Sequence, residues 1–194
     1  MKKSARTVLP EGYREIFAVD LQGNKKLALL VNGIAAVIAV IMAAVMLPFV
    51  PISSLFDLSD GLGPYALRFA VLAFGSVAYI ILHELVHGIT MKFFGAGKIK
   101  YGFTGIYAYA GCADFFPKFS YIVIALAPVV LWGAVLALIN FLVPLPWFWV
   151  VYLIQITNLS GAAGDLYVTV KFCRLPRDIL VADDGTAMRI YSAE

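Results

Sequence analysis

Residues 66–91 read ALRFAVLAFGSVAYIILHELVHGITM, a stretch that is long and apolar yet contains His83, Glu84 and His87. About 20 apolar residues are enough for an α-helix to cross the hydrocarbon core of a bilayer. We therefore predict a membrane-spanning helix over residues 66–91. Ionisable side chains are costly inside a bilayer and usually mark function, so this helix is also the first place to look for a site.

The composition of the whole chain supports a membrane protein. Of its 194 residues, 62% are hydrophobic, and the charged residues number only 15 Lys and Arg and 12 Asp and Glu. Soluble domains are about 45–50% apolar and about 25% charged. The composition also argues against intrinsic disorder, a disulfide-rich secreted scaffold and a nucleic-acid binder that relies on dense positive charge.

Three further stretches, residues 27–47, 120–142 and 147–170, have the length and apolarity of membrane spans. Apart from Arg68, near the outer end of the second span, the basic residues lie before the first span, between the second and third, and after the fourth. The loop between the first two spans contains no Lys or Arg. By the positive-inside rule, the tails 1–26 and 171–194 are cytoplasmic and the protein lies in the cell membrane.

Residues 95–119 differ from the spans because they are rich in Gly, Tyr and Phe and partly alternate in polarity. This pattern favours a short membrane-associated β-hairpin or a re-entrant loop; an interfacial loop with aromatic anchors fits equally well. The predicted fold is thus an all-α membrane protein, a single domain over residues 1–194, with four transmembrane helices and this hairpin or loop between the second and third.

The motif His83-Glu84-Leu85-Val86-His87 is H-E-x-x-H. On a helix, its two imidazoles project from one face and can share a Zn²⁺ ion, while the Glu can hold a water and take its proton. The alternative is a polar cluster that holds helices together, which is expensive for three such groups inside a bilayer.

A zinc site needs a third protein ligand, and Asp165 is the best candidate. The chain has no other histidine, and Asp165 is the only other carboxylate deep in a predicted span. At 1.5 Å per residue, His87 lies about 8 Å before Lys92 and Asp165 about 9 Å before Lys171, so the two have matching depths. The small residues 160–164 would let another helix approach closely. Asp114, in the loop, is a weaker alternative.

Asn158 precedes Asp165 by two helical turns and so lies on roughly the same face. Its amide could donate a hydrogen bond to a substrate carbonyl or oxyanion. A hydrogen bond between helices is at least as good an explanation.

These residues resemble a known family. H-E-L-V-H in the second span, Ala127-Pro128 in the third and Asn158 with Gly164-Asp165 in the fourth are similar to the bacterial "putative zincin peptidases", compact relatives of the site-2 protease superfamily. The resemblance implies that His83, His87 and Asp165 bind zinc and that Glu84 is the catalytic base. It also implies that residues 95–119 form a hairpin that presents an edge strand to unfolded substrate.

The sequence thus predicts a zinc-dependent intramembrane endopeptidase that hydrolyses a membrane-tethered protein near the cytoplasmic leaflet. Its expected partners are that substrate and the lipid bilayer, without nucleic acid, and the oligomeric state is left open. The alternative is a non-catalytic, metal-containing membrane protein that binds a partner or regulates another membrane protein.

Overall fold

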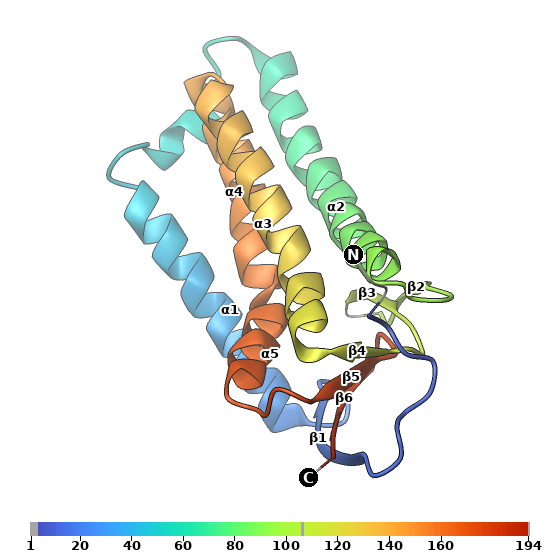
Figure 1. Ribbon diagram of the computed structural model, residues 1–194. Coiled ribbons are helices and arrows are strands. Elements are labelled where there is room, and N and C mark those ends of the chain that lie inside the picture. Colours follow the sequence, from blue (N-terminus) through green and yellow to red (C-terminus); the bar gives the residue numbers. More distant parts are fainter. Residues whose placement is uncertain (1–3, 106, 194) are drawn as a thin grey trace. The chain divides into compact units, whose positions relative to one another are not determined.

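Long helices and two small antiparallel sheets make up the fold in the computed structural model, which describes residues 4–105 and 107–193 (Figure 1). Residues 1–3 and 194 of the predicted tails, and residue 106 of the predicted hairpin region, lie outside the described residues. The elements are, in chain order, β1 (Arg14–Asp20), α1 (Lys25–Met46), the 3₁₀ helix η1 (Ile52–Phe56), α2 (Leu62–Phe93), β2 (Lys100–Phe103), β3 (Ala108–Gly111), β4 (Phe115–Pro117), α3 (Lys118–Leu142), α4 (Leu145–Gly161), α5 (Ala163–Cys173), β5 (Leu180–Asp183) and β6 (Ala187–Ser192).

The chain divides into two compact units, which we describe separately. The sheet unit comprises the described parts of Met1–Val31, His83–Pro128 and Gly164–Glu194, and the helical unit comprises Asn32–Leu82 and Val129–Ala163. In the helical unit, α4 packs along η1, and the buried Trp149 donates its indole N–H to the Val50 carbonyl at 3.2 Å.

A four-stranded antiparallel sheet organises the sheet unit, with strand order β1-β6-β5-β4 (Figure 1). β5 and β6 form a hairpin in which Asp184 N–H donates to the Ala187 carbonyl, and Gly185 in the turn has a φ of +91°. Glycine adopts this conformation without steric cost. The second sheet is the hairpin of β2 and β3, within residues 95–119.

The prediction of an all-α fold is wrong, because both predicted tails contribute strands. β1 comes from the N-terminal tail and pairs with β6 from the C-terminal one, so that Arg14 lies opposite Ser192. β5 in turn pairs with β4, which comes from the end of the 95–119 region. A sheet assembled from such short and distant segments leaves little periodicity in any one of them.

The core of the sheet unit lies between this sheet and the nearby ends of α2, α3 and α5. It contains side chains that are almost fully buried. The most deeply buried of its large members are Met91, Phe116, Ile124, Phe172, Ile179 and Ile190.

Three helices, α1, α2 and α3, are long and apolar enough to cross a membrane. Few of their side chains are buried, and large apolar ones such as Phe74 and Phe141 are 76% and 84% exposed. Apolar surface of this extent is unusual on a soluble monomer but suits contact with lipid.

The predicted fourth span over residues 147–170 is wrong as a single helix. α4 ends at Gly161, Ala162 has φ −82° and ψ +15°, and α5 begins at Ala163. Glycine is a poor helix former, and glycines stand on both sides of the break. A Cβ at Gly161 or Gly164 would meet no described atom within 4 Å, so the expected close approach of another helix does not explain these two glycines.

The packing predicts that the C-terminal strand is part of the core rather than a loose tail. Ile190→Ala should lower the free energy of unfolding by about 2–5 kcal/mol, because a fully buried side chain is replaced by a cavity. Ile16→Ala, on the neighbouring strand at 41% exposure, is the matched control and should cost less than about 1 kcal/mol. Denaturant unfolding of both variants in detergent micelles measures the difference, and equal small losses would contradict the packing.

Candidate metal centre

His83 and His87 lie one turn apart on α2, and both are buried, with 8% of each residue exposed. Their ring centroids are 4.9 Å apart with the ring planes at 76°. The helix thus holds the two imidazoles side by side, as the i and i+4 spacing of the motif requires.

The Asp165 carboxylate, in the first turn of α5, faces both imidazoles. Its Oδ2 is 3.6 Å from His83 Nε2 and its Oδ1 is 3.7 Å from His87 Nε2. In a tetrahedral zinc site, with bonds of about 2.1 Å, two ligand atoms lie about 3.4 Å apart. Among the described residues, these three form the group of His, Cys, Asp or Glu side chains that could hold a metal ion, and its donors fit zinc.

The orientation of His87 depends on a proline in α3. Pro128 lies inside that helix and has no N–H, so it cannot donate to the carbonyl of Ile124, four residues earlier. That carbonyl instead lies 2.9 Å from His87 Nδ1. With Nδ1–H donating to Ile124, Nε2 keeps its lone pair toward Asp165. A metal-binding histidine commonly has such a partner on its other nitrogen.

Glu84 faces the hairpin of β2 and β3. Its carboxylate is within hydrogen-bonding reach of the Ala110 N–H on β3, and its charge interacts with those of His87 and Asp165. One turn further along α2, Gly88 receives the Tyr101 side chain of β2, whose hydroxyl oxygen lies 2.0 Å from where a Cβ would stand. The hairpin therefore rests on the face of α2 that carries Glu84.

The turn between β5 and β6 supports the other side of the hairpin. The Asp183 carbonyl accepts the Cys112 N–H at 2.7 Å. The Asp183 carboxylate accepts hydrogen bonds from the Tyr121 hydroxyl and from the Gly185 N–H, and burial raises its pKa to about 6. Burial also raises the pKa of the Cys112 thiol to about 11, and this cysteine is not among the three donors that could hold a metal ion.

Comparison with known proteins identifies the family. Residues 76–180, more than half of the chain, match the family described as "Putative zincin peptidase". The chain belongs to this family. The matched region contains the H-E-x-x-H motif, Pro128 and Asp165.

Membership of this family suggests metallopeptidase activity and zinc as the metal. The donors His83, His87 and Asp165 agree with zinc. A curated relative, the "Uncharacterized 24.7 kDa protein in gap 5'region" of Pyrococcus woesei, is 30% identical over 118 residues, which are 58% of this chain. The match spans about half of that protein (51%). No solved structure matches the chain significantly.

Two other candidate residues from the sequence, Asn158 and Asp114, form hydrogen bonds with groups other than the three donors. Asn158 belongs to the helical unit and is fully buried; its amide donates to the Val129 carbonyl at 3.2 Å and accepts from the Tyr79 hydroxyl at 2.9 Å. This is the hydrogen bonding between helices that the sequence left open, and its role toward a substrate stays a prediction. Asp114 accepts the Gly97 N–H at 2.6 Å.

Sequence reasoning missed two residues around this zincin peptidase centre. Pro128 was noted in the sequence as part of the family resemblance, whereas the useful signal was the carbonyl that a proline frees four residues earlier. Asp183 carried a weaker signal, because Asp184-Gly185 between short apolar runs is typical of a hairpin turn.

Metal content tests the three donors directly. Purified full-length protein should hold about one zinc per chain, and His87→Ala and Asp165→Ala should each hold less than about a tenth of that, because two donors bind zinc far more weakly than three. Asp114→Ala is the matched carboxylate control and should keep its zinc. Inductively coupled plasma mass spectrometry provides the measurement. Retention of zinc by Asp165→Ala would rule out Asp165 as a ligand.

Pro128→Ala should separate metal affinity from stability. Alanine restores an N–H that competes for the Ile124 carbonyl, so we expect zinc affinity to fall by about 10–100-fold. The metal-free protein should be as stable or more stable, because proline is unfavourable inside a helix. Zinc titration against a chelator and thermal unfolding measure the two effects. Pro64→Ala, in the first turn of α2, is the control, and a parallel loss of stability and affinity would contradict this role.

Proposed function

We propose that this member of the zincin peptidase family is a zinc-dependent intramembrane endopeptidase, similar in type to the site-2 proteases. Its substrate is a membrane-tethered protein, cleaved near the cytoplasmic leaflet. The observation that carries the proposal is the meeting of His83, His87 and Asp165 beside Glu84, with the two histidines on a helix that is long and apolar enough to cross a membrane.

The position in the membrane follows from charge. The two helices that supply the metal donors each have a basic residue near their C-terminal end. Lys92 lies in the last turn of α2 and Lys171 in the last turn of α5. The loop between α1 and α2 has no Lys or Arg. The positive-inside rule then supports cytoplasmic termini and a site toward the cytoplasmic leaflet of the cell membrane.

The residues have distinct roles in peptide hydrolysis. His83, His87 and Asp165 would hold the zinc ion, with His87 fixed by the Ile124 carbonyl. Bound zinc supplies Lewis acidity, which polarises a scissile carbonyl and makes water acidic enough to be used at neutral pH. Glu84 takes the proton of the attacking water on its carboxylate and passes it to the nitrogen of the leaving amine.

The Ala110 N–H, within reach of the Glu84 carboxylate, would help to orient this base. A Glu84 oxygen that accepts the Ala110 N–H would leave the second oxygen free to face the water. The hairpin that supplies this N–H is itself supported on Gly88 and on the Asp183 carbonyl. Catalytic positioning thus depends on the hairpin as well as on α2.

Glu84→Gln tests the reaction. This variant should keep its zinc but lose cleavage by about 10²–10⁴-fold, the usual contribution of a general base. The assay reconstitutes full-length protein in liposomes with a library of single-span peptides and identifies products by mass spectrometry. Glu15→Gln, on β1, is the matched control. Cleavage that persists in Glu84→Gln, or zinc-loaded wild type that cleaves nothing, would exclude the peptidase and favour the non-catalytic partner-binding role.

A further inference from the structure

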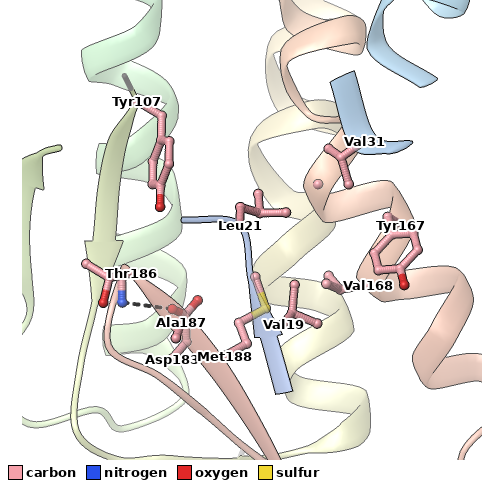
Figure 2. Close-up of a pocket in the computed structure, with 12 residues that line it drawn as sticks. Val19, Leu21, Val31, Tyr107, Tyr167, Val168, Asp183, Thr186, Ala187 and Met188 are labelled. Atoms are coloured by element: carbon pink, nitrogen blue, oxygen red, sulfur yellow. Dashed lines mark hydrogen bonds between the residues drawn. The ribbon is translucent and has the colours of Figure 1, made fainter. Parts of the chain in front are cut away.

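The sheet unit contains a cavity of about 80 Å³ (Figure 2). Its wall is mainly aliphatic and comes from segments that are far apart in the sequence. Val19 and Leu21 come from β1 and the turn after it, Val168 from α5 and Met188 from β6. The Tyr107 side chain, from the β2–β3 hairpin region, closes another side (Figure 2).

The cavity adjoins the segment that carries the metal ligand Asp165. Gly164, which lines it, immediately precedes the ligand Asp165. Asp183, which also lines it, is close enough for its charge to interact with those of Glu84, His87 and Asp165. The hairpin that supplies Tyr107 is the one that contacts Glu84 through Ala110. The cavity therefore reaches the residue before the ligand Asp165, in the same unit that holds His83, Glu84 and His87.

The lining determines which chemical group would fit. Asp183 is the one carboxylate in the wall among the described residues, and both of its oxygens already accept hydrogen bonds, from Tyr121 and Gly185. It therefore has little to offer a cationic side chain, and a buried polar group without a partner would be costly. The rest of the wall is mainly apolar, with six aliphatic side chains beside Tyr107, Tyr167, Thr186 and two glycines, and suits an apolar group.

The volume sets the size of that group. A cavity of about 150 Å³ holds a benzene ring, and this one has about half of that volume. An aliphatic group of three or four carbons fits, whereas an aromatic ring does not. Two lining residues can be changed to alter its size, Met188 with its long side chain and Ala187 with its small one.

We infer that this cavity is a specificity subsite that receives an aliphatic side chain, of about the size of valine or leucine, next to the scissile peptide bond of the substrate. The inference rests on the proposed function, because the side chain is delivered by a chain whose carbonyl lies at the metal centre. It extends that function by naming the substrate class.

Zinc-anchored probes test the subsite without needing a substrate. The probes are four hydroxamic acids that carry a methyl, isopropyl, isobutyl or benzyl group, and their binding to full-length, zinc-loaded protein in micelles is measured by isothermal titration calorimetry. Burial of each methylene strengthens binding by about fourfold. We expect wild type to bind the isobutyl probe at least about tenfold more tightly than the methyl probe, and the benzyl probe more weakly than the isobutyl one.

Two variants should move this preference in opposite directions. Met188→Ala enlarges the cavity and should favour the benzyl probe over the isobutyl one. Ala187→Leu fills the cavity and should abolish the advantage of the isobutyl probe while leaving the methyl probe unaffected. Met46→Ala, which lies in the helical unit, removes the same side chain elsewhere and should match wild type.

The outcomes separate the two proposals. If the methyl probe binds but the size preference is absent, or is unchanged in Met188→Ala and Ala187→Leu, the subsite is refuted while the metal centre stands. If no probe binds to wild type, the zinc-dependent function fails and the subsite fails with it. Binding of the methyl probe that is lost in His87→Ala identifies the metal as the anchor.

Discussion

The hydrogen bond between His87 and the Ile124 carbonyl is the interaction on which the centre depends. A histidine that binds a metal through Nε2 needs a partner for Nδ1, and a helix normally uses all of its interior carbonyls itself. Here Pro128 leaves one of them unused, at 2.9 Å from the ring nitrogen. Proline inside a helix costs roughly 3 kcal/mol. The free carbonyl accepts the Nδ1–H of His87, and this hydrogen bond fixes the orientation of the imidazole.

Other buried polar groups of the sheet unit are also paired in hydrogen bonds. Asp183 bonds Tyr121 on α3 with one oxygen and Gly185 with the other, while its carbonyl bonds Cys112. Ser4, close to the start of the chain, bonds Ser120 at 2.8 Å. Each of these bonds joins segments that are distant in sequence or anchors a turn between them. Because buried polar groups are expensive without partners, these bonds connect α3 and the β5–β6 turn to distant segments, and the bond to Cys112 holds the end of the β2–β3 hairpin.

How far the sequence could predict this structure depends on the distance over which each feature is encoded. His83, Glu84 and His87 form a local pattern, and the helical period alone places them on neighbouring faces. The sheet is not local, since Arg14 pairs with Ser192 and its strands are only three to seven residues long. Strands this short are stabilised by their partners and by the core rather than by their own propensity. Hydropathy therefore identified the long helices α1, α2 and α3, whereas β1, β5 and β6 fall in segments predicted to be tails.

The break between α4 and α5 is the feature where composition was most misleading. Averaged over residues 147–170, hydropathy describes one span, because glycine and alanine count as apolar although they do not hold a helix equally well. In the structure the helix stops at Gly161 and starts again at Ala163, which puts Asp165 in a first turn. There the backbone N–H groups have no partners within the helix, and the helix dipole favours negative charge. A continuous helix would have placed the same carboxylate in mid-helix without that support. The break thus puts Asp165 at the start of a helix, where its carboxylate faces both imidazoles.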